Sequence, residues 1–200
     1  MKTNALIIFT RNPKLGKVKS RLAKTIGEEK ALEIYKDLLQ HTFSVTQNLE
    51  CEKFVFYDTQ IIKKDKWKNT IYHKKLQIGN DLGERMQNAL QELFHLGYKN
   101  CIIVGSDLFD LQSKHINEAF AKLESNDVVI GPAEDGGYYL LGLTNIIPAI
   151  FSNKNWGTST VLEDSLKDLA TFSVDFIEIL NDIDTFEDLE KSAYYTCKKI

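Results

Sequence analysis

Short apolar runs alternate along the chain with longer stretches in which apolar residues recur every three or four positions. The short runs predict strands, because four to eight β-branched or aromatic residues suit a buried strand. These runs are 5–9, 53–57, 73–78, 101–104, 127–131 and 172–180. The longer stretches predict helices over 28–49, 82–97 and 113–123, after Thr160, and from Thr185 through 190–199. The lysine-rich segment 61–75 is expected to be a surface helix and connection.

Helix starts are marked by side chains that can accept hydrogen bonds from free backbone N–H groups. Asp81 with Glu84, Thr160 with Glu163, and Thr185 with Asp188 have the spacing of capping boxes. Segment 10–22, with Pro13 and Gly16, is expected to be a loop.

Alternating strands and helices predict an α/β fold with a mostly parallel, doubly wound sheet and helices on both faces. The 200 residues suffice for one compact domain, and no repeat, low-complexity tract or linker divides them. We therefore expect residues 1–200 to form a single domain.

Composition narrows the class of protein. A net charge of −3 argues against a general nucleic-acid binder, which is usually strongly basic. The three cysteines lie far apart without CxxC spacing, which favours a reducing cytoplasm over a disulfide framework. The first apolar run is too short for a signal peptide or a membrane span. The oligomeric state stays open.

A basic loop follows the first predicted strand. Six basic residues and no acidic one lie between Arg11 and Lys24, and they include Lys17, Lys19 and Arg21. With Gly16, such a loop can hold a pyrophosphate through backbone N–H groups and cationic side chains. It is neither a Walker A nor a GxGxxG motif, and a solvated basic loop is the alternative.

A second polar segment precedes the helix that starts near residue 82. Gln77 and Gly79 could present amide and backbone groups to the edge of a nucleobase. Arg85 lies in the first turn, where a positive charge opposes the helix dipole. An anionic ligand would explain it, and so would a local pair with Asp81 or Glu84.

The strand 101–104 runs into Ser106, Asp107 and Asp110. Acidic residues at the carboxyl end of a buried strand lie where open α/β sheets bind ligands. A carboxylate there needs solvent, a partner or a cation, so we expect Asp107 to bind a divalent metal that holds a diphosphate. Capping of the next turn is the alternative.

Three further segments carry candidate binding groups. Glu134, Asp135, Gly136 and Gly137 either let a substrate approach the backbone and a carboxylate, or form a hairpin turn. Trp156 either walls a sugar pocket or packs in the interior. Asp182 and Asp184 share a face in extended chain, and N-capping is their alternative role.

Five motifs in this order resemble those of the DUF2064 family of GT-A-fold transferases, often labelled arsenosugar-biosynthesis or radical-SAM-associated glycosyltransferases. The motifs are Arg11-x-Pro13-x-x-Gly16-x-Val18-Lys19-Ser20-Arg21-Leu22, Asp81-Leu82-Gly83-Glu84-Arg85-Met86, Gly105-Ser106-Asp107-x-x-Asp110-Leu111, Gly131-Pro132-Ala133-Glu134-Asp135-Gly136-Gly137-Tyr138-Tyr139-Leu140 and Trp156-Gly157-Thr158-Ser159. Leu108-Phe109 stand where the family usually has Cys-Pro, and Arg11 and Ser20 where it usually has Lys and Thr. The wider superfamily includes nucleotidyltransferases.

The resemblance implies the nucleotide-diphospho-sugar transferase (GT-A) fold and a set of roles. Asp107 and Asp184 would bind Mg²⁺ or Mn²⁺, and Asp135 would be the general base or a binding carboxylate for the acceptor. The donor nucleotide would be held by residues of the first two motifs and the segment before the second: Arg11, Gly16, Lys17, Lys19, Arg21, Gln77, Gly79, Asp81 and Arg85. The small-molecule acceptor would be held by Glu134, Gly136, Gly137, Tyr138 and Trp156.

Three functions fit this pattern. The first is glycosyl transfer from a nucleotide-diphosphate sugar to a small hydroxyl acceptor, favoured by the 134–139 segment. The second is nucleotidyl transfer from a nucleoside triphosphate with release of pyrophosphate. The third is nucleotide binding without catalysis. The base, the sugar, the acceptor and the stereochemical outcome stay open.

Overall fold

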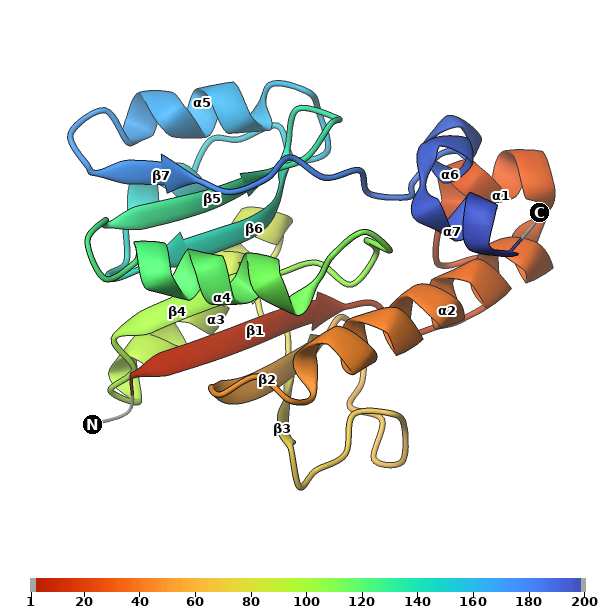
Figure 1. The fold of residues 1–200 in the computed structure, drawn as a ribbon, viewed down its shortest axis with the longest axis horizontal. Coiled ribbons are helices and arrows are strands. Elements are labelled where there is room, and N and C mark those ends of the chain that lie inside the picture. The colour runs from red at the N-terminus through yellow and green to blue at the C-terminus, as the bar shows by residue number, and fades with distance from the viewer. Residues whose placement is uncertain (1–2, 199–200) are drawn as a thin grey trace.

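A computed structural model describes residues 3–198, which form one seven-stranded sheet with helices on both faces (Figure 1). The strands are β1 (Asn4–Thr10), β2 (Glu52–Tyr57), β3 (Tyr72–Leu76), β4 (Asn100–Val104), β5 (Val128–Pro132), β6 (Tyr138–Leu143) and β7 (Val174–Phe176). The helices are α1 (Ser20–Ile26), α2 (Glu28–Thr46), α3 (Leu82–His95), α4 (Ser113–Lys122), the 3₁₀ turn η1 (Pro148–Phe151), α5 (Val161–Asp168), α6 (Phe186–Lys191) and α7 (Ala193–Lys198).

The strand order is β3-β2-β1-β4-β6-β5-β7, and only β6 runs against the others. The prediction of a mostly parallel, doubly wound α/β sheet is therefore confirmed. Because the other strands share one direction, the segments that follow them meet at one edge of the sheet.

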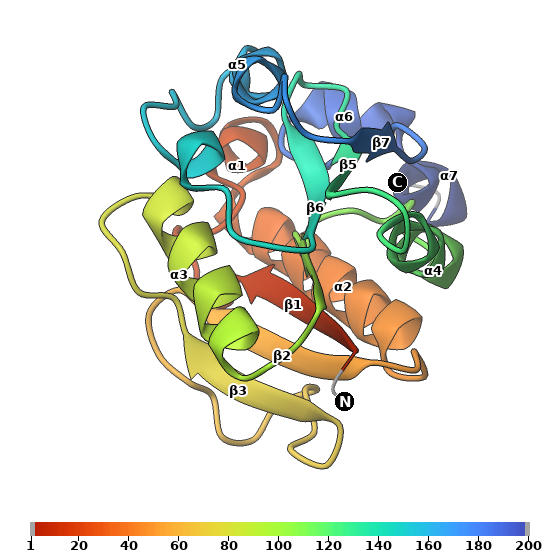
Figure 2. The ribbon, with the colours of Figure 1, turned by 90° about the vertical axis from the view of Figure 1, so that its left-hand side faces the viewer.

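Strand periodicity divides the core between the two faces of the sheet. Leu6 and Ile8 pack with α2 and α4, whereas Ala5 and Ile7 pack with α3, η1 and α5 (Figure 2). A third cluster, which includes Leu22, joins α1 and α2 to the C-terminal helices α6 and α7 (Figure 1). This third cluster fixes the segments before α1 and α6 next to each other at the carboxyl edge.

The expected helix over 61–75 is wrong. Residues 61–71 form bends and turns, and β3 begins at Tyr72. Asp65 accepts hydrogen bonds from Tyr57 Oη (2.6 Å) and Lys74 Nζ (2.7 Å), and Trp67 is buried beside them. These contacts across the sheet edge replace the local bonds that a helix would make.

Other boundaries also differ from expectation. Helix α1 begins at Ser20, inside the segment expected to be a loop. Thr160 makes no side-chain cap, because its torsions (φ −97°, ψ −6°) are helical rather than extended. The last strand spans only Val174–Phe176 of the predicted 172–180.

The helix predicted over 190–199 is divided by Ser192, whose torsions are extended, and its residue 199 lies outside the described residues. The capping box expected at Thr185 is present, whereas at Asp81 only the N-cap half forms, because the Glu84 carboxylate accepts from the N–H of Asn80 instead of that of Asp81. Among residues 3–198, no helix has the length and apolar character needed to cross a bilayer.

Candidate functional site

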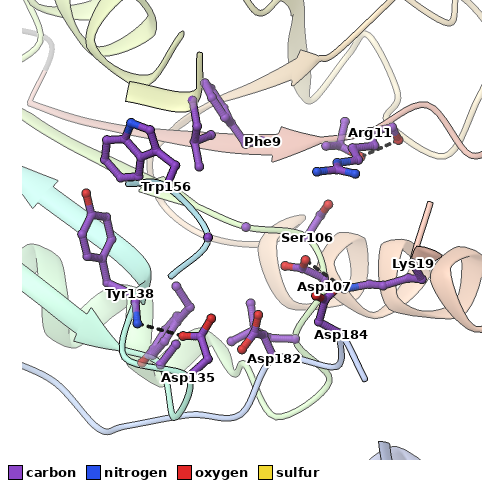
Figure 3. A pocket seen from close by; sticks show the side chains of 18 of the residues that line it. Phe9, Arg11, Lys19, Ser106, Asp107, Asp135, Tyr138, Trp156, Asp182 and Asp184 are labelled. Atoms are coloured by element: carbon purple, nitrogen blue, oxygen red, sulfur yellow. Dashed lines mark hydrogen bonds and ion pairs between the residues drawn. The ribbon is translucent and has the colours of Figure 1, made fainter. Parts of the chain in front are cut away.

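A cavity of about 520 Å³ opens at the carboxyl edge of the sheet (Figure 3). Its lining comes from the segments that follow β1, β3, β4, β5 and β7, together with the start of β6 and the 152–160 loop. Two parts of the lining differ in chemistry. The cation-rich half comprises Arg11, Lys19, Arg21, Asp107 and Asp184, and the aromatic half comprises Phe9, Leu82, Met86, Asp135, Tyr138 and Trp156.

Lys19 connects the two carboxylates of the cation-rich half. Its Nζ lies 3.0 Å from Asp107 Oδ2 and 4.0 Å from Asp184 Oδ1. Arg21 Nη1 donates to the other oxygen of Asp184 at 3.2 Å. The Lys19 side chain is only 3% exposed, whereas that of Arg21 is 60% exposed. One buried and one exposed cation therefore hold this carboxylate pair.

The local backbone explains how Lys19 reaches this place. Lys19 adopts a left-handed conformation (φ 49°, ψ 45°) at the position before α1. Only glycine and a few polar residues adopt this conformation readily. As a result, Lys19 is buried and lines the cavity. Lys17, two residues earlier, is exposed and does not line the cavity.

The ionisation of this half follows from burial and pairing. Burial alone would raise the pKa of Asp107, but the charge and hydrogen bond of Lys19, with the charge of Arg11, hold it below its usual value. Burial would lower the pKa of Lys19, but Asp107, Asp184 and Asp182 together raise it. Both partners are therefore charged at neutral pH.

Asp182 lies between the two halves (Figure 3) and has no ion pair among residues 3–198. Burial, then the charges of Asp107 and Asp135, raise its pKa to about 7, with Lys19 acting in the opposite direction. At neutral pH this carboxyl is therefore close to half-protonated.

The aromatic half is built on two segments that pack together. The rings of Tyr138 and Trp156 are 6.4 Å apart and nearly perpendicular. Gly83, in the first turn of α3, accommodates the indole, because a Cβ there would lie 2.7 Å from Trp156 Cζ2. Leu82 remains 43% exposed at the rim, and Met86 is buried below it.

The β5–β6 connection is a hairpin turn held by Asp135, whose Oδ1 accepts from the N–H of Gly137 at 2.8 Å. Gly136 has a φ of +88°, and a Cβ there would lie 2.2 Å from the carbonyl oxygen of Ser159. The N–H of Leu162 donates to the Gly136 carbonyl. The turn is thereby tied to the loop that carries Trp156.

The side-chain amide of Gln77 is fixed in one orientation. Its Nε2 donates to the carbonyl oxygens of Phe56 (2.9 Å) and Thr10 (3.2 Å). Because a carbonyl oxygen can only accept, the NH₂ group of the amide must face these two oxygens. Gln77 lines the cavity, and no group in residues 3–198 donates to its Oε1. It therefore offers an acceptor to whatever fills this part of the cavity.

The carboxylates of the cation-rich half provide a donor set for a hard divalent cation. Asp107 and Asp184 are close enough to share the Lys19 ammonium group, and oxygen ligands suit Mg²⁺ or Mn²⁺. Residues 3–198 contain no group of three or more His, Cys, Asp or Glu side chains arranged around one metal position. The set thus fits an ion that takes its remaining ligands from phosphate oxygens and water.

Sequence comparison shows the family. A family model described as "Uncharacterized protein conserved in bacteria (DUF2064)" matches residues 41–158. The chain belongs to the DUF2064 family. Among curated proteins, none matches the sequence.

Solved structures place this DUF2064 protein in the nucleotide-diphospho-sugar transferase (GT-A) fold, as expected. A protein of Desulfovibrio desulfuricans G20, provisionally named a nucleotide-diphospho-sugar transferase, is 27% identical over 98% of this chain and 94% of its own, with a TM-score of 0.85. The 4-diphosphocytidyl-2C-methyl-D-erythritol synthase of Anaerococcus prevotii DSM 20548 is 11% identical over 98% and 96%, with a TM-score of 0.64. Rv0371c of Mycobacterium tuberculosis H37Rv, solved with manganese, is 10% identical over 96% and 97%, with a TM-score of 0.57. The fold thus occurs in both nucleotide-sugar transferases and nucleotidyltransferases.

The cavity of this DUF2064 protein brings together ten of the candidate residues. They are Arg11, Lys19, Arg21, Gln77, Asp107, Asp135, Gly137, Tyr138, Trp156 and Asp184. Seven others lie outside its lining: Gly16, Lys17, Gly79, Asp81, Arg85, Glu134 and Gly136. The sequence analysis therefore identified residues of both halves of the cavity. Its candidate set also contained neighbouring residues that do not line the cavity.

The local contacts of these outer residues are specific. Asp81 caps α3 by accepting from the N–H of Glu84, and Arg85 Nε donates to the Gly79 carbonyl at 3.0 Å. Gly16 lies against the Glu28 carboxylate, because a Cβ at Gly16 would be only 3.0 Å from its two oxygens. The local pair of Arg85 with Asp81 or Glu84, one of the two interpretations from the sequence, is not formed among residues 3–198, and the Gly79 carbonyl is the partner instead.

Residues that the sequence analysis did not assign to the site also line the cavity. Asp182 is the clearest: the sequence analysis noted that it shares a face with Asp184 in extended chain but gave it no role in the site. Phe9 and Met86 read as core residues from periodicity alone. Tyr35, on α2, accepts from the N–H of Arg11 at 2.8 Å and carries no motif that could have indicated this contact.

Proposed function

We propose that this protein transfers a glycosyl group from a nucleotide-diphosphate sugar to a hydroxyl group of a small acceptor, with Mg²⁺ or Mn²⁺. The observation that carries the proposal is the juxtaposition of Lys19, Asp107 and Asp184 in one cavity at the carboxyl edge. These residues come from three distant parts of the chain, and they meet where open α/β sheets bind ligands. The D. desulfuricans protein of the same fold supports the donor class.

Arg11, Lys19 and Arg21 would neutralise the diphosphate of the donor. The Arg11 guanidinium has no ion pair among residues 3–198 and lies across the cavity from Lys19 (Figure 3). Two unit charges 4 Å apart near a protein surface attract by about 4 kcal/mol at an effective dielectric of 20. Several such contacts would stabilise the departing nucleoside diphosphate.

Asp107 and Asp184 would hold the divalent cation. When bound, such an ion neutralises charge on the phosphate oxygens of the donor. Lys19 remains between the two carboxylates and keeps them oriented toward the cavity. This arrangement makes donor binding depend on both the cation and the lysine.

Asp135 is the proposed general base. One of its oxygens is engaged by the Gly137 N–H, and no group in the described part of the chain pairs with its other oxygen. It lines the cavity and has no cationic partner, so it can accept the proton of an incoming hydroxyl.

A thermal-shift panel tests the donor assignment. UDP-, GDP- and ADP-sugars and free nucleoside triphosphates are each added with and without Mn²⁺, because a ligand that binds only the folded protein raises its melting temperature. We expect a shift with one sugar nucleotide that requires Mn²⁺ and is lost in Asp107→Asn. Glu134→Gln, exposed and outside the cavity, is the control. An equal shift in Asp107→Asn would contradict the assignment.

Nucleotidyl transfer is a second candidate, since the fold is shared with the synthase of A. prevotii. The products separate the two reactions. Release of a nucleoside diphosphate from a sugar nucleotide supports glycosyl transfer, and release of pyrophosphate from a triphosphate supports nucleotidyl transfer.

A further inference from the structure

All the cations that line the cavity lie in one short segment. Arg11, Lys19 and Arg21 are its only lysine, arginine or histidine residues in the described part of the chain. Lys19 and Arg21 are already paired with Asp107 and Asp184. From β5 onward, the lining contributes carboxylates but no cation.

The carboxylate of the aromatic half is uncompensated. Asp135 forms no ion pair within residues 3–198, and its one hydrogen bond comes from a backbone N–H in its own turn. Asp182, next to it in Figure 3, likewise has no ion pair there. The free oxygen of the Asp135 carboxylate can only accept hydrogen bonds, so this floor of the aromatic half favours hydroxyl or ammonium donors and disfavours anions.

The walls above this floor are apolar and aromatic. Phe9, Tyr138 and Trp156 surround the space (Figure 3). Leu82, which is 43% exposed, adds to the apolar lining. Aromatic faces bind the apolar surface of a sugar or other polyol ring, and they attract cations. Among the described residues, neither the walls nor the floor of the aromatic half presents a cation to a phosphate.

We propose that the aromatic half binds an acceptor hydroxyl compound without an anionic group, neutral or cationic, and discriminates against phosphate esters. This inference rests on the proposed function, because it assigns the acceptor class of that same cavity. It also disfavours a phosphate nucleophile, which nucleotidyl transfer to a phosphate ester would require.

Transfer to such an acceptor forms one bond and breaks one bond at the anomeric carbon of the donor sugar. The acceptor oxygen bonds to the anomeric carbon, and the bond from that carbon to the diphosphate oxygen breaks. Its electron pair leaves with the nucleoside diphosphate, whose charge faces Arg11 and Lys19. The hydroxyl proton passes to the Asp135 carboxylate and then to solvent.

Ionic quenching of Trp156 fluorescence tests the charge of this half without knowledge of the acceptor. Trp67, the other tryptophan, is buried at 2% exposure, so the difference between wild type and Trp156→Phe isolates the Trp156 signal. Because caesium is intrinsically a weaker quencher of indole than iodide, each quenching constant is divided by the constant for free N-acetyltryptophanamide. On this scale we expect caesium to quench Trp156 at least twice as efficiently as iodide, with acrylamide as the neutral reference. Asp135→Asn, which preserves the acceptor for the Gly137 N–H, reduces this preference. On the same scale, iodide quenching equal to or above that of caesium would overturn the proposal.

Matched acceptor probes test the chemical class directly. With Mn²⁺ and nucleoside diphosphate present, Trp156 emission is followed during titration with glycerol or glycerol 3-phosphate, and with glucose or glucose 6-phosphate. We expect no phosphate ester to perturb Trp156 at a lower concentration than its neutral partner. A phosphate ester effective at tenfold lower concentration overturns the inference. Because the quenching needs no donor, failure of the thermal-shift panel would remove the proposed function separately.

Discussion

The cation-rich half and the aromatic half of the cavity hold their carboxylates in opposite situations. Asp107 and Asp184 share a buried ammonium group, and Asp184 also pairs with an exposed guanidinium, whereas Asp135 has only a backbone N–H. Compensated carboxylates stay ionised and fixed, which suits a group that holds a cation. An uncompensated carboxylate is available to take a proton. The contrast therefore separates binding from chemistry within one cavity.

The largest expected effect concerns the aromatic half, where Asp135 is the proposed general base. Asp135→Asn retains the hydrogen bond to Gly137 but cannot accept a proton. We expect acceptor-dependent turnover to fall by about 100- to 10,000-fold, as for loss of a general base, with donor affinity unchanged. Product release measured beside thermal shift checks both parts. Wild-type turnover in Asp135→Asn would remove the distinction between the halves.

The next largest effect concerns the cation-rich half. Lys19→Met leaves Asp107 and Asp184 without their buried partner. Because both carboxylates are more than a third exposed, solvent screens part of the loss, and we expect the unfolding free energy to fall by about 2 kcal/mol. Urea denaturation measures this loss, and Mn²⁺ should restore part of it by replacing the missing charge. Lys17→Met is the control, because Lys17 is exposed in the same loop. Equal stability of the two variants would contradict the compensation.

A third prediction concerns the contact between the hairpin turn and the Trp156 loop. Gly136→Ala forces a Cβ toward the Ser159 carbonyl, and we expect a loss of about 2 kcal/mol with a change in Trp156 emission. Gly97→Ala has nearly the same φ (+89° against +88°) but open space around it. This control should lose about 1 kcal/mol from backbone strain alone. Identical losses would show that the contact carries no energy.

The smallest effect sharpens the comparison within the cation-rich half. Arg21→Gln removes an exposed partner of Asp184, so the unfolding free energy should change by less than about 1 kcal/mol. Donor affinity should fall a few-fold, with a weaker dependence on salt, because Arg21 faces the proposed diphosphate position. Titrations of donor at two salt concentrations measure this. A stability loss as large as that of Lys19→Met would contradict the assigned roles.

The fold could be predicted from the sequence because its signals are local. The continuous apolar run of β1 and the three- and four-residue spacing in α2 are patterns that one element carries by itself. The segment 61–71 could not be predicted in this way. Its conformation depends on Asp65 meeting Tyr57 and Lys74, which are contacts between elements.

The site was predictable to the extent that polar residues follow strands at one edge. Asp107 and Asp184 are such residues, and the structure brings them together. That Lys19 rather than Lys17 lies between them depends on a left-handed residue that no sequence pattern indicated. The position of Asp182 likewise depends on the path of the chain between β7 and α6, which local sequence patterns do not predict.

The place of Asp184 after β7 affects the order in which the site can assemble. Asp107 and Lys19 are synthesised first, and the carboxylate that completes their cluster follows β7, the last strand in chain order of the described sheet. A nascent chain halted after residue 180 would contain every described strand of the sheet and still lack Asp182 and Asp184. Competence to bind the proposed donor is therefore acquired only after the segment that carries these two residues has been made and α6 and α7 have packed against α1 and α2.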